Sequence, residues 1–133
     1  MYKGNTLTVS AIEPGLYELC FDNQSDSVNK FDAATITELA EAGALLKDSG
    51  AKGLLVTSGK PVFVVGADIT EFKGNFALDD AAFTANLDGA NACFNQLEDL
   101  PMPTVCAING LALGGGLEVT LACDFRVMST VAK

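Results

Sequence analysis

The chain has 133 residues, of which 49% are hydrophobic and 19% are charged, and its formal net charge is −9. This length and composition fit one folded domain with a substantial core and exclude a disordered chain. The acidic balance argues against nucleic acid as a partner, since nucleic-acid-binding proteins present a basic face. An anionic ligand would have to be held by local groups rather than by the overall field.

The residue types that the sequence lacks exclude several kinds of site. There is no histidine, so these residues cannot form a Ser-His-Asp or Cys-His catalytic set, and we expect no metal site. The cysteines lie in apolar segments without metal-ligand spacing, which predicts free thiols in a reducing compartment. Because neither a signal peptide nor a membrane-spanning apolar run is present, we expect a cytoplasmic protein without a membrane segment.

The first third of the chain alternates between strand and helix patterns. Strands are predicted at Leu7–Val9 and Leu16–Phe21. Asp32 is a good N-cap for a helix that runs to about Lys47, and its apolar residues follow helical spacing. Residues 54–56 then form a short apolar strand. This strand–helix–strand order predicts an α/β fold.

A first loop of interest follows the apolar run Pro61–Val65. Gly66 breaks the run, and Asp68 or Thr70 can cap a short helical turn behind it. Backbone amides can be left free at such a place, directly after a strand. Taken alone, however, the segment is more typical of an ordinary loop between a strand and a helix.

A long helix is predicted next. Asp79 can cap a helix over Asp80–Leu100, and prolines at positions 101 and 103 end it. Apolar side chains recur along one face, and we expect this stripe to lie in the core. The stripe consists of Phe83, Leu87, Ala90, Phe94 and Leu97.

A second loop of interest lies between a strand at Thr104–Ile108 and a buried helix at Leu117–Ala122. The loop passes through a turn and then through three consecutive glycines, Gly114–Gly116. Phe125–Met128 is predicted to be a further core strand. Because the chain ends five residues later, we expect residues 1–133 to be the N-terminal part of a larger domain.

A strand, a glycine-rich turn and a helix start together favour a site for negative charge. The first N–H groups of a helix have no partner within it, and glycines let a ligand approach them closely. Glu118 lies in the first helical turn among apolar neighbours, which suggests a general acid/base beside an oxyanion hole. The alternative is that the glycines serve close packing and that Glu118 complements the helix dipole.

Both loops resemble those of the enoyl-CoA hydratase/isomerase, or crotonase, superfamily. The resemblance rests on three segments, residues 27–32, 63–72 and 107–118. It implies an α/β crotonase-type ββα spiral with a mainly parallel sheet, of which this chain is the N-terminal portion. The amino-acid sequence of residues 2–4 and 66–72 is most similar to that of one branch of the family, the bacterial multifunctional fatty-acid oxidation subunits. In that branch a 3-hydroxyacyl-CoA dehydrogenase part follows the crotonase domain.

The resemblance implies a role for particular residues. Ala67 and Gly115 match the two positions whose backbone N–H groups bind the thioester oxygen, and Glu118 matches the first catalytic glutamate. Lys30 lies in the early loop that approaches the CoA phosphates. The remaining acyl-CoA contacts are expected from the backbone of the two loops. They fall on Val64, Val65, Gly66, Ala67, Asp68, Ile69 and Gly114.

The implied activity is the hydration of 2-enoyl-CoA in fatty-acid β-oxidation, with some capacity for double-bond isomerisation. A glutamate in an apolar pocket has a raised proton affinity, which suits proton shuttling. Family members use a second glutamate farther along the chain, in a Gly-Leu-Pro-Glu-type segment, and we expect it beyond Lys133. The isolated 133 residues are therefore expected to be nearly inactive. Thiolase β subunit is the implied partner, and NAD would be needed only by a following dehydrogenase part; this chain itself needs no cofactor.

Other readings stay open. A non-catalytic acyl-CoA-binding or assembly fragment would also explain the two loops without a second acid. A nucleotide-binding α/β module is disfavoured, because no Gly-x-Gly-x-x-Gly follows a strand. A truncated spiral would also expose apolar surface, so association into homo-oligomers is expected.

Overall fold

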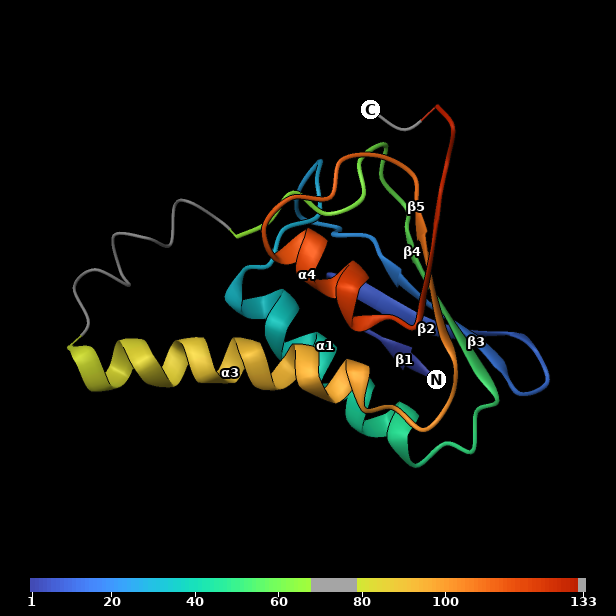
Figure 1. The fold of residues 1–133 in the computed structure, drawn as a ribbon, viewed down its shortest axis with the longest axis horizontal. Helices are drawn as coiled ribbons and strands as arrows, with labels where there is room; N and C mark the ends of the chain where they lie inside the picture. Colours follow the sequence, from blue (N-terminus) through green and yellow to red (C-terminus); the bar gives the residue numbers. More distant parts are fainter. Residues whose placement is uncertain (68–78, 132–133) are drawn as a thin grey trace.

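A computed structural model describes residues 1–67 and 79–131 of the chain. The described strands form one six-stranded sheet in the order β1-β2-β3-β4-β5-β6. β2 pairs antiparallel with both β1 and β3, whereas β3 to β6 are parallel. Their bounds are β1 Tyr2–Lys3, β2 Leu7–Glu13, β3 Leu16–Phe21, β4 Gly53–Ser58, β5 Thr104–Ile108 and β6 Phe125–Met128. The expected mixed α/β architecture with a mainly parallel sheet is confirmed (Figure 1).

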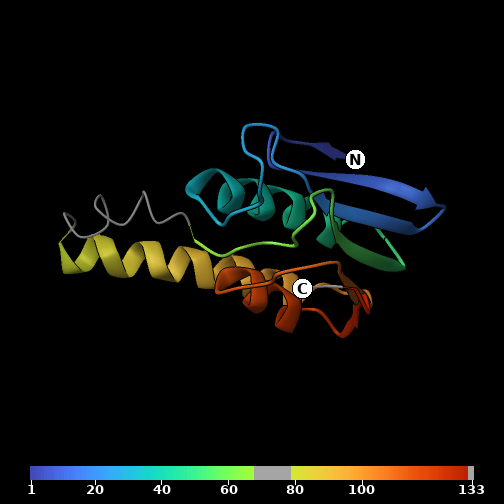
Figure 2. The same cartoon turned by 90° about the horizontal axis from the view of Figure 1, so that it is seen from above.

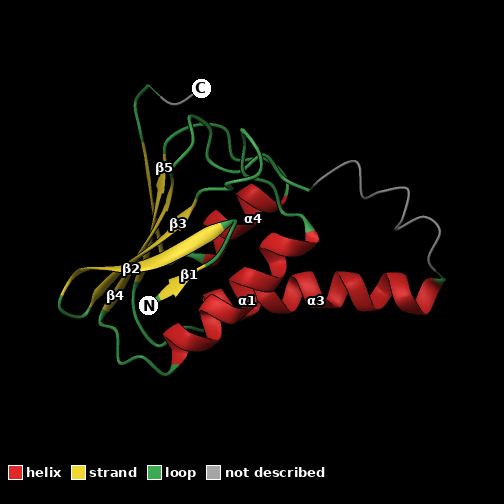
Figure 3. Ribbon diagram, turned by 180° about the vertical axis from the view of Figure 1, so that it is seen from behind, coloured by secondary structure: helices red, strands yellow, loops and turns green. Residues whose placement is uncertain are grey.

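Three helices in the described ranges connect the parallel strands and lie on one side of the sheet (Figures 1 and 3). They are α1 Ala33–Lys47, α3 Asp80–Glu98 and α4 Gly115–Ala122. Asp32 caps α1 by accepting a hydrogen bond from the Thr35 amide at 2.8 Å. Asp79 caps α3 in the same way, through the Ala82 amide at 2.8 Å. Both predicted N-caps are therefore confirmed.

The core lies between the sheet and the helices. Its fully buried side chains come from alternate positions of the strands and from the inner face of α1, as the two periodicities require. The largest are Leu7, Leu19, Phe21, Leu39, Leu46 and Phe63. Phe21 makes edge-to-face contacts with Phe31 and Phe63, at centroid distances of 5.6 and 6.3 Å. These rings connect the ends of the central strands to the loops that follow them.

The predicted core stripe of α3 is only partly correct. Cys93 and Leu97 are buried near the end of the helix, but Phe83 is 38% exposed and Leu87 is 51% exposed. The reason is the placement of the helix, whose first half extends past α1 and the sheet (Figures 1 and 2). Periodicity predicts which face of a helix is apolar, but not how far its neighbours reach along it.

The prediction of a core strand at Phe125–Met128 is wrong in its burial. The strand exists as β6, but it lies at the edge of the sheet and all four residues are exposed. The outer side of α4 is also uncovered, with Leu121 61% exposed, so this helix is only half buried. We call this region the C-terminal apolar face; it consists of Leu113, Leu117, Leu121 and Met128. Phe125 and Val127 are exposed on the other side of β6.

Within residues 1–67 and 79–131, no helix is long and apolar enough to cross a membrane.

Candidate functional site

The two loops singled out in the sequence meet at the carboxyl ends of β4 and β5. Residues 61–67 follow β4, and residues 109–114 follow β5. The amides of Phe63 and Val64 donate to the Leu111 carbonyl at 3.0 and 3.2 Å, and the Leu113 amide donates to the Val64 carbonyl at 3.1 Å. The loops are therefore joined by backbone hydrogen bonds, as the carboxyl ends of neighbouring parallel strands allow.

Glycines allow the closest approach between the loops. Gly66 has a φ of +96°, and a Cβ atom there would lie 3.0 Å from the Leu113 carbonyl oxygen. Gly114 has a φ of +53°, and its Cβ position lies 3.6 Å from the Cα of Gly66. A side chain at either position would be strained by the positive φ, and one at Gly66 would also push the loops apart. These glycines are needed for the shape of the site, as the sequence pattern predicted.

The third glycine of the triplet packs the start of α4 onto the first loop. A Cβ atom on Gly116 would overlap the Val64 carbonyl oxygen and would lie 2.8 Å from the Val64 carbonyl carbon. The packing interpretation of the triplet is thus correct for Gly116. It does not exclude a ligand-binding role for its neighbours, because Gly116 faces the first loop rather than the open start of the helix.

The direction of the Ala67 N–H group is set by the carbonyl of the same peptide unit, that of Gly66. The Gly66 carbonyl accepts a hydrogen bond from the Phe31 amide at 2.7 Å. Among the described residues no peptide bond is cis, and in a trans peptide the C=O and N–H groups point in opposite directions. The Ala67 N–H group therefore points away from Phe31, and no acceptor for it occurs in the described ranges.

The amide of Gly115 is oriented in the same manner. The Gly114 carbonyl accepts the first α-helical hydrogen bond of α4, from the Glu118 amide at 3.0 Å. The Gly115 N–H group consequently points outward from the helix start, where the helix dipole contributes partial positive charge. It too has no acceptor within residues 1–67 and 79–131. The two loops thus present two oriented amide donors that have no acceptor among the described residues.

Glu118 lies in the first turn of α4, as expected, but its surroundings differ from the prediction. The sequence predicted a carboxylate enclosed by apolar side chains, whereas Glu118 is exposed. Its neighbour Leu117 is exposed as well. The cause is the uncovered C-terminal apolar face, on which nothing in the described structure packs. Apolar neighbours along the sequence do not enclose a side chain unless another element covers them.

The other expected acyl-CoA contacts fall into three groups. Val64 is fully buried and its amide and carbonyl both bond the second loop, so it presents no surface to a ligand in this structure, whereas Val65 is half-buried. Lys30 is half-buried and forms an ion pair with Asp26 at 3.0 Å. Two further predicted residues, at positions 68 and 69, lie outside the described residues.

An apolar cavity of about 200 Å³ opens beside the glycine loop. It lies where the end of β5, the following loop and the start of α4 meet the end of β6. Its lining consists of Ile108, Gly110, Leu111, Ala112, Leu113, Leu117 and Met128. The described residues contain no group of three or more metal-ligating side chains. The chemistry available here is therefore that of backbone donors, one carboxylate and an apolar recess.

Sequence reasoning missed the role of Asn29, whose side chain and backbone hold the first loop in place. Its buried side-chain oxygen accepts from the Asn23 amide at 2.9 Å. Its side-chain nitrogen donates to the carbonyls of Phe21 and Phe63 and to the Ser58 hydroxyl, at 2.9, 3.0 and 2.9 Å. Its backbone carbonyl accepts from the Val65 amide at 3.0 Å. An asparagine in a polar loop carries no signal of burial, so the pattern could not identify it.

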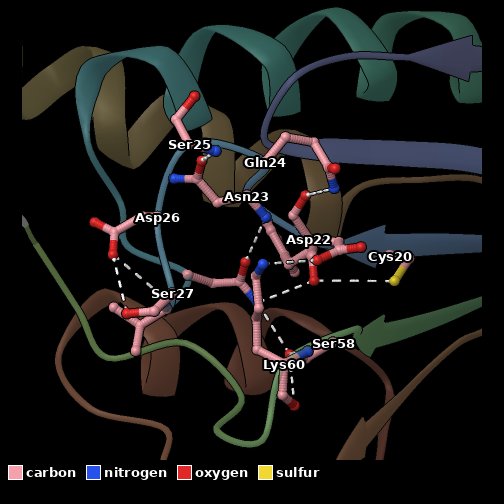
Figure 4. A network of polar contacts seen from close by, with 12 residues as sticks. Cys20, Asp22, Asn23, Gln24, Ser25, Asp26, Ser27, Ser58 and Lys60 are labelled. Carbon is pink, nitrogen blue, oxygen red and sulfur yellow. Dashed lines mark hydrogen bonds and ion pairs between the residues drawn. The ribbon is translucent and has the colours of Figure 1, made fainter.

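The surrounding loop is held by further polar contacts (Figure 4). Lys60 forms an ion pair with Asp22 at 3.0 Å, and the Ser58 hydroxyl donates to the Val62 carbonyl at 2.8 Å. The ion pair joins the loop after β3 to the loop after β4. Such a network limits the movement of residues 61–67.

Comparison with known proteins shows the family of the chain. A sequence model described as "Enoyl-CoA hydratase/isomerase" matches residues 12–133. The chain belongs to the enoyl-CoA hydratase/isomerase family. It is 54% identical to the fatty acid oxidation complex subunit alpha of Pseudomonas putida over the whole of this chain and 19% of that relative. The chain thus spans about a fifth of the length of the curated relatives that it matches.

Solved structures agree with this assignment. The enoyl-CoA hydratase of Bacillus anthracis has a TM-score of 0.82 and 26% identity, covering 96% of this chain and 48% of that protein. An enoyl-CoA hydratase from Shewanella pealeana has a TM-score of 0.85 at 22% identity, covering 92% of this chain and 46% of that protein; at this identity the likeness concerns the fold alone. The crotonase resemblance and the crotonase fold inferred from the sequence are both confirmed.

Proposed function

We propose that this chain forms part of the active site of an enoyl-CoA hydratase that acts in fatty-acid β-oxidation. In this reaction the oxygen of water bonds to the β carbon of a 2-enoyl-CoA, and a proton is added to the α carbon. Negative charge builds up on the thioester oxygen between the two steps. The chemistry therefore requires fixed donors at that oxygen and a carboxylate at the carbon chain.

The observation that supports this most strongly is the contact between Gly66 and the Leu113–Gly114 backbone. The peptide units of Ala67 and Gly115 lie on these adjacent loops, and in each the carbonyl accepts a hydrogen bond while the N–H group has no acceptor within residues 1–67 and 79–131. We assign these two N–H groups as the oxyanion hole. A donor of this kind commonly contributes about 3–4 kcal/mol to transition-state stabilisation.

Glu118 is proposed as the catalytic carboxylate of this half of the site. It would orient and deprotonate the attacking water, together with a second glutamate that this chain does not contain, and the α carbon would be reprotonated from the same pair. Isomerisation of a neighbouring double bond is proposed to be open to the same site, chiefly through that second glutamate. The 133 residues alone are proposed to be nearly inactive.

The acyl-CoA would lie along the first loop. The backbone of residues 65–69 and Gly114 would contact the thioester end, with buried Val64 supporting it from within the loop, and Lys30 would approach the CoA phosphates. The ion pair between Lys30 and Asp26 means that a phosphate would have to share or replace that carboxylate. We propose that no cofactor acts in this part of the site, and that NAD is required only where a dehydrogenase part follows.

The assembly of the whole protein is inferred from its relatives. Because the matched relatives are named as alpha subunits of a fatty acid oxidation complex, we propose a thiolase β subunit as partner, a cytoplasmic location and association between copies of the chain. The uncovered C-terminal apolar face supports association, since an apolar area of this kind is unfavourable in water.

Two substitutions in the full-length protein test the site directly. Glu118→Gln should lower the hydration of crotonyl-CoA by orders of magnitude, measured as the loss of absorbance of the conjugated thioester. Gly115→Pro removes one N–H donor at the first helical residue, where proline is best tolerated. It should lower kcat by about 100-fold or more. Gly115→Ala is the reference variant, because it also adds a Cβ against Phe31 but keeps the N–H group; the loss in Gly115→Pro beyond that in Gly115→Ala measures the donor. Normal turnover by Gly115→Pro would refute the oxyanion assignment.

A non-catalytic acyl-CoA-binding function is the second candidate, and the exposure of Glu118 favours it for the isolated chain. Calorimetric titration of the 133-residue chain with a saturated acyl-CoA would measure binding without turnover. Binding together with an inactive full-length protein would support this candidate. Substantial hydratase activity from the chain itself would refute both it and the need for a second glutamate.

A further inference from the structure

Phe31 is the one residue that the described contacts place against both proposed donor loops. Its backbone amide donates to the Gly66 carbonyl at 2.7 Å, and that carbonyl belongs to the peptide unit that carries the Ala67 N–H group. Its side chain lies against the second loop. The three atoms nearest to the Cβ position of Gly115 all belong to Phe31, and the closest, Cδ2, is 3.0 Å away.

The ring of Phe31 has little freedom to move. It is 6% exposed and packs edge-to-face between two other rings, Phe21 at 5.6 Å and Phe94 at 5.3 Å between centroids. Phe21 belongs to the sheet and Phe94 to α3, so the ring is held from both layers of the fold. Aromatic rings in such arrangements are rigid spacers, because they interdigitate without voids.

The backbone of Phe31 is held equally firmly. Two residues earlier, the Asn29 carbonyl accepts from the Val65 amide at 3.0 Å, and Phe31 itself forms a parallel bridge with Ala67. Residues 29–31 therefore run alongside residues 65–67 in register. A shift of the Phe31 backbone would move the Gly66–Ala67 peptide, whereas a change in its ring would alter only the support of Gly115.

We propose that Phe31 is a positioning residue that sets the separation between the Ala67 and Gly115 amide donors. Its backbone fixes the first donor and its ring limits the approach of the second. This inference rests on the proposed oxyanion hole, because it concerns the geometry of those two amides. Phe31 has no polar side-chain atom and no direct role in the chemistry.

The expected effect is large because oxyanion stabilisation depends on distance. Donors act at about 2.7–3.1 Å from the oxyanion, and a misplacement of about 1 Å can lower a rate by roughly 100-fold. A smaller side chain at position 31 leaves space into which Gly115 and the start of α4 can settle. The donors would then bind the ground-state thioester about as well, but they would fit the transition state less well.

The test compares Phe31→Leu with Phe94→Leu in the full-length protein. Both remove a ring from the same aromatic cluster, but the ring of Phe31 lies against Gly115, whereas the ring of Phe94 packs on Phe31 from α3. Phe31→Leu should lower kcat for crotonyl-CoA by roughly 10- to 100-fold, with KM changed by less than about threefold. Phe94→Leu should change both parameters by less than about threefold. Phe31→Met removes the ring with about the same loss of volume as Phe31→Leu but leaves an unbranched, adaptable chain, so it should lower kcat within the same range and serves if Phe31→Leu does not fold.

A spectroscopic readout separates positioning from loss of stability. Hydrogen bonds from the oxyanion hole polarise the thioester carbonyl and lower its stretching frequency in bound acyl-CoA. Phe31→Leu should reduce this frequency shift, whereas Phe94→Leu should preserve it at equal occupancy. A merely destabilising substitution would lower the amount of active protein but leave the frequency of the bound ligand unchanged.

The contact itself is tested by a double-mutant cycle with Gly115→Ala. In the wild-type background the added Cβ meets the Phe31 ring at 3.0 Å, so kcat should fall. In the Phe31→Leu background the same Cβ occupies the vacated space, so the second substitution should restore part of the rate. Effects on kcat that multiply independently would refute the contact as the source of positioning.

The outcomes also separate this inference from the proposed function. If Gly115→Pro abolishes activity while Phe31→Leu behaves like Phe94→Leu, only the role of Phe31 is wrong. If Gly115→Pro retains full activity, the oxyanion assignment is wrong and the role of Phe31 is wrong with it. Loss of kcat and of the carbonyl shift in Phe31→Leu, with both retained in Phe94→Leu, supports the inference.

Discussion

Gly116→Ala tests the packing on which the candidate site depends. Gly116 lies in the first turn of α4, and in a generic helix alanine is more favourable than glycine by about 1 kcal/mol. Here the added Cβ would overlap the Val64 carbonyl oxygen and lie 2.8 Å from the carbonyl carbon. Carbon atoms at rest are separated by about 3.5–4.0 Å, so either α4 or the first loop must move.

The first loop has little room to yield. Val64 is fully buried, its amide bonds the Leu111 carbonyl, and its own carbonyl accepts from the Leu113 amide at 3.1 Å. Overpacking of this kind costs about 1–3 kcal/mol, and a weakened backbone hydrogen bond adds about 1 kcal/mol. After the gain in helix propensity, we expect a net loss of about 1–3 kcal/mol in the free energy of unfolding.

The control is Gly89→Ala, which makes the same chemical change in the exposed part of α3. No atom lies within 4 Å of its Cβ position, so the propensity term acts alone and the variant should gain up to about 1 kcal/mol. Urea unfolding of the 133-residue protein, followed by far-ultraviolet circular dichroism, gives both values at a common m-value. The reasoning would be refuted if Gly116→Ala were as stable as Gly89→Ala.

Three further predictions concern groups outside the glycine contact. Burial raises the pKa of Glu38, but hydrogen bonds from Thr6, Asn5 and Leu7 outweigh it and lower the pKa. The stability that Glu38 contributes is therefore present above the unfolded pKa of about 4.3 and is lost as the pH falls through the lower folded value. Glu38→Gln should remove this acid dependence, which unfolding curves between pH 3 and 5 would reveal. Burial and the 2.6 Å hydrogen bond to Glu41 raise the pKa of Tyr2 to about 12. In a Tyr17→Phe variant, which leaves Tyr2 as the tyrosine that is observed, phenolate absorbance should stay absent until near that pH. A transition near pH 10 would contradict this. Asn29→Ala leaves buried backbone groups unpaired and should cost about 1–3 kcal/mol, more than Ser58→Ala in the same assay; equal losses would show that Asn29 is not the main anchor.

Local signals in the sequence predicted the elements well. Asp32 and Asp79 occupy the predicted N-cap positions, because a side chain that can accept from the first helical amides acts within three residues of itself. The convergence of the two glycine loops was also predictable, since parallel strands bring their carboxyl ends to one edge of the sheet. What could not be predicted is which residues hold the two loops in place. Asn29 and Phe31 do so through partners far away along the chain.

Burial was the less predictable property, and α4 and β6 show why. Their apolar residues were expected in the core, yet Leu121 and Phe125 are exposed by 61% and 62%. An apolar pattern measures the tendency of a side chain to leave water, but the surface that covers it comes from another element. Glu118 emerges from the same uncovered face as Leu117 and Leu121. The enclosure of the proposed catalytic carboxylate therefore depends on whatever packs on the C-terminal apolar face, whereas the two amide donors are oriented entirely by contacts within the described residues.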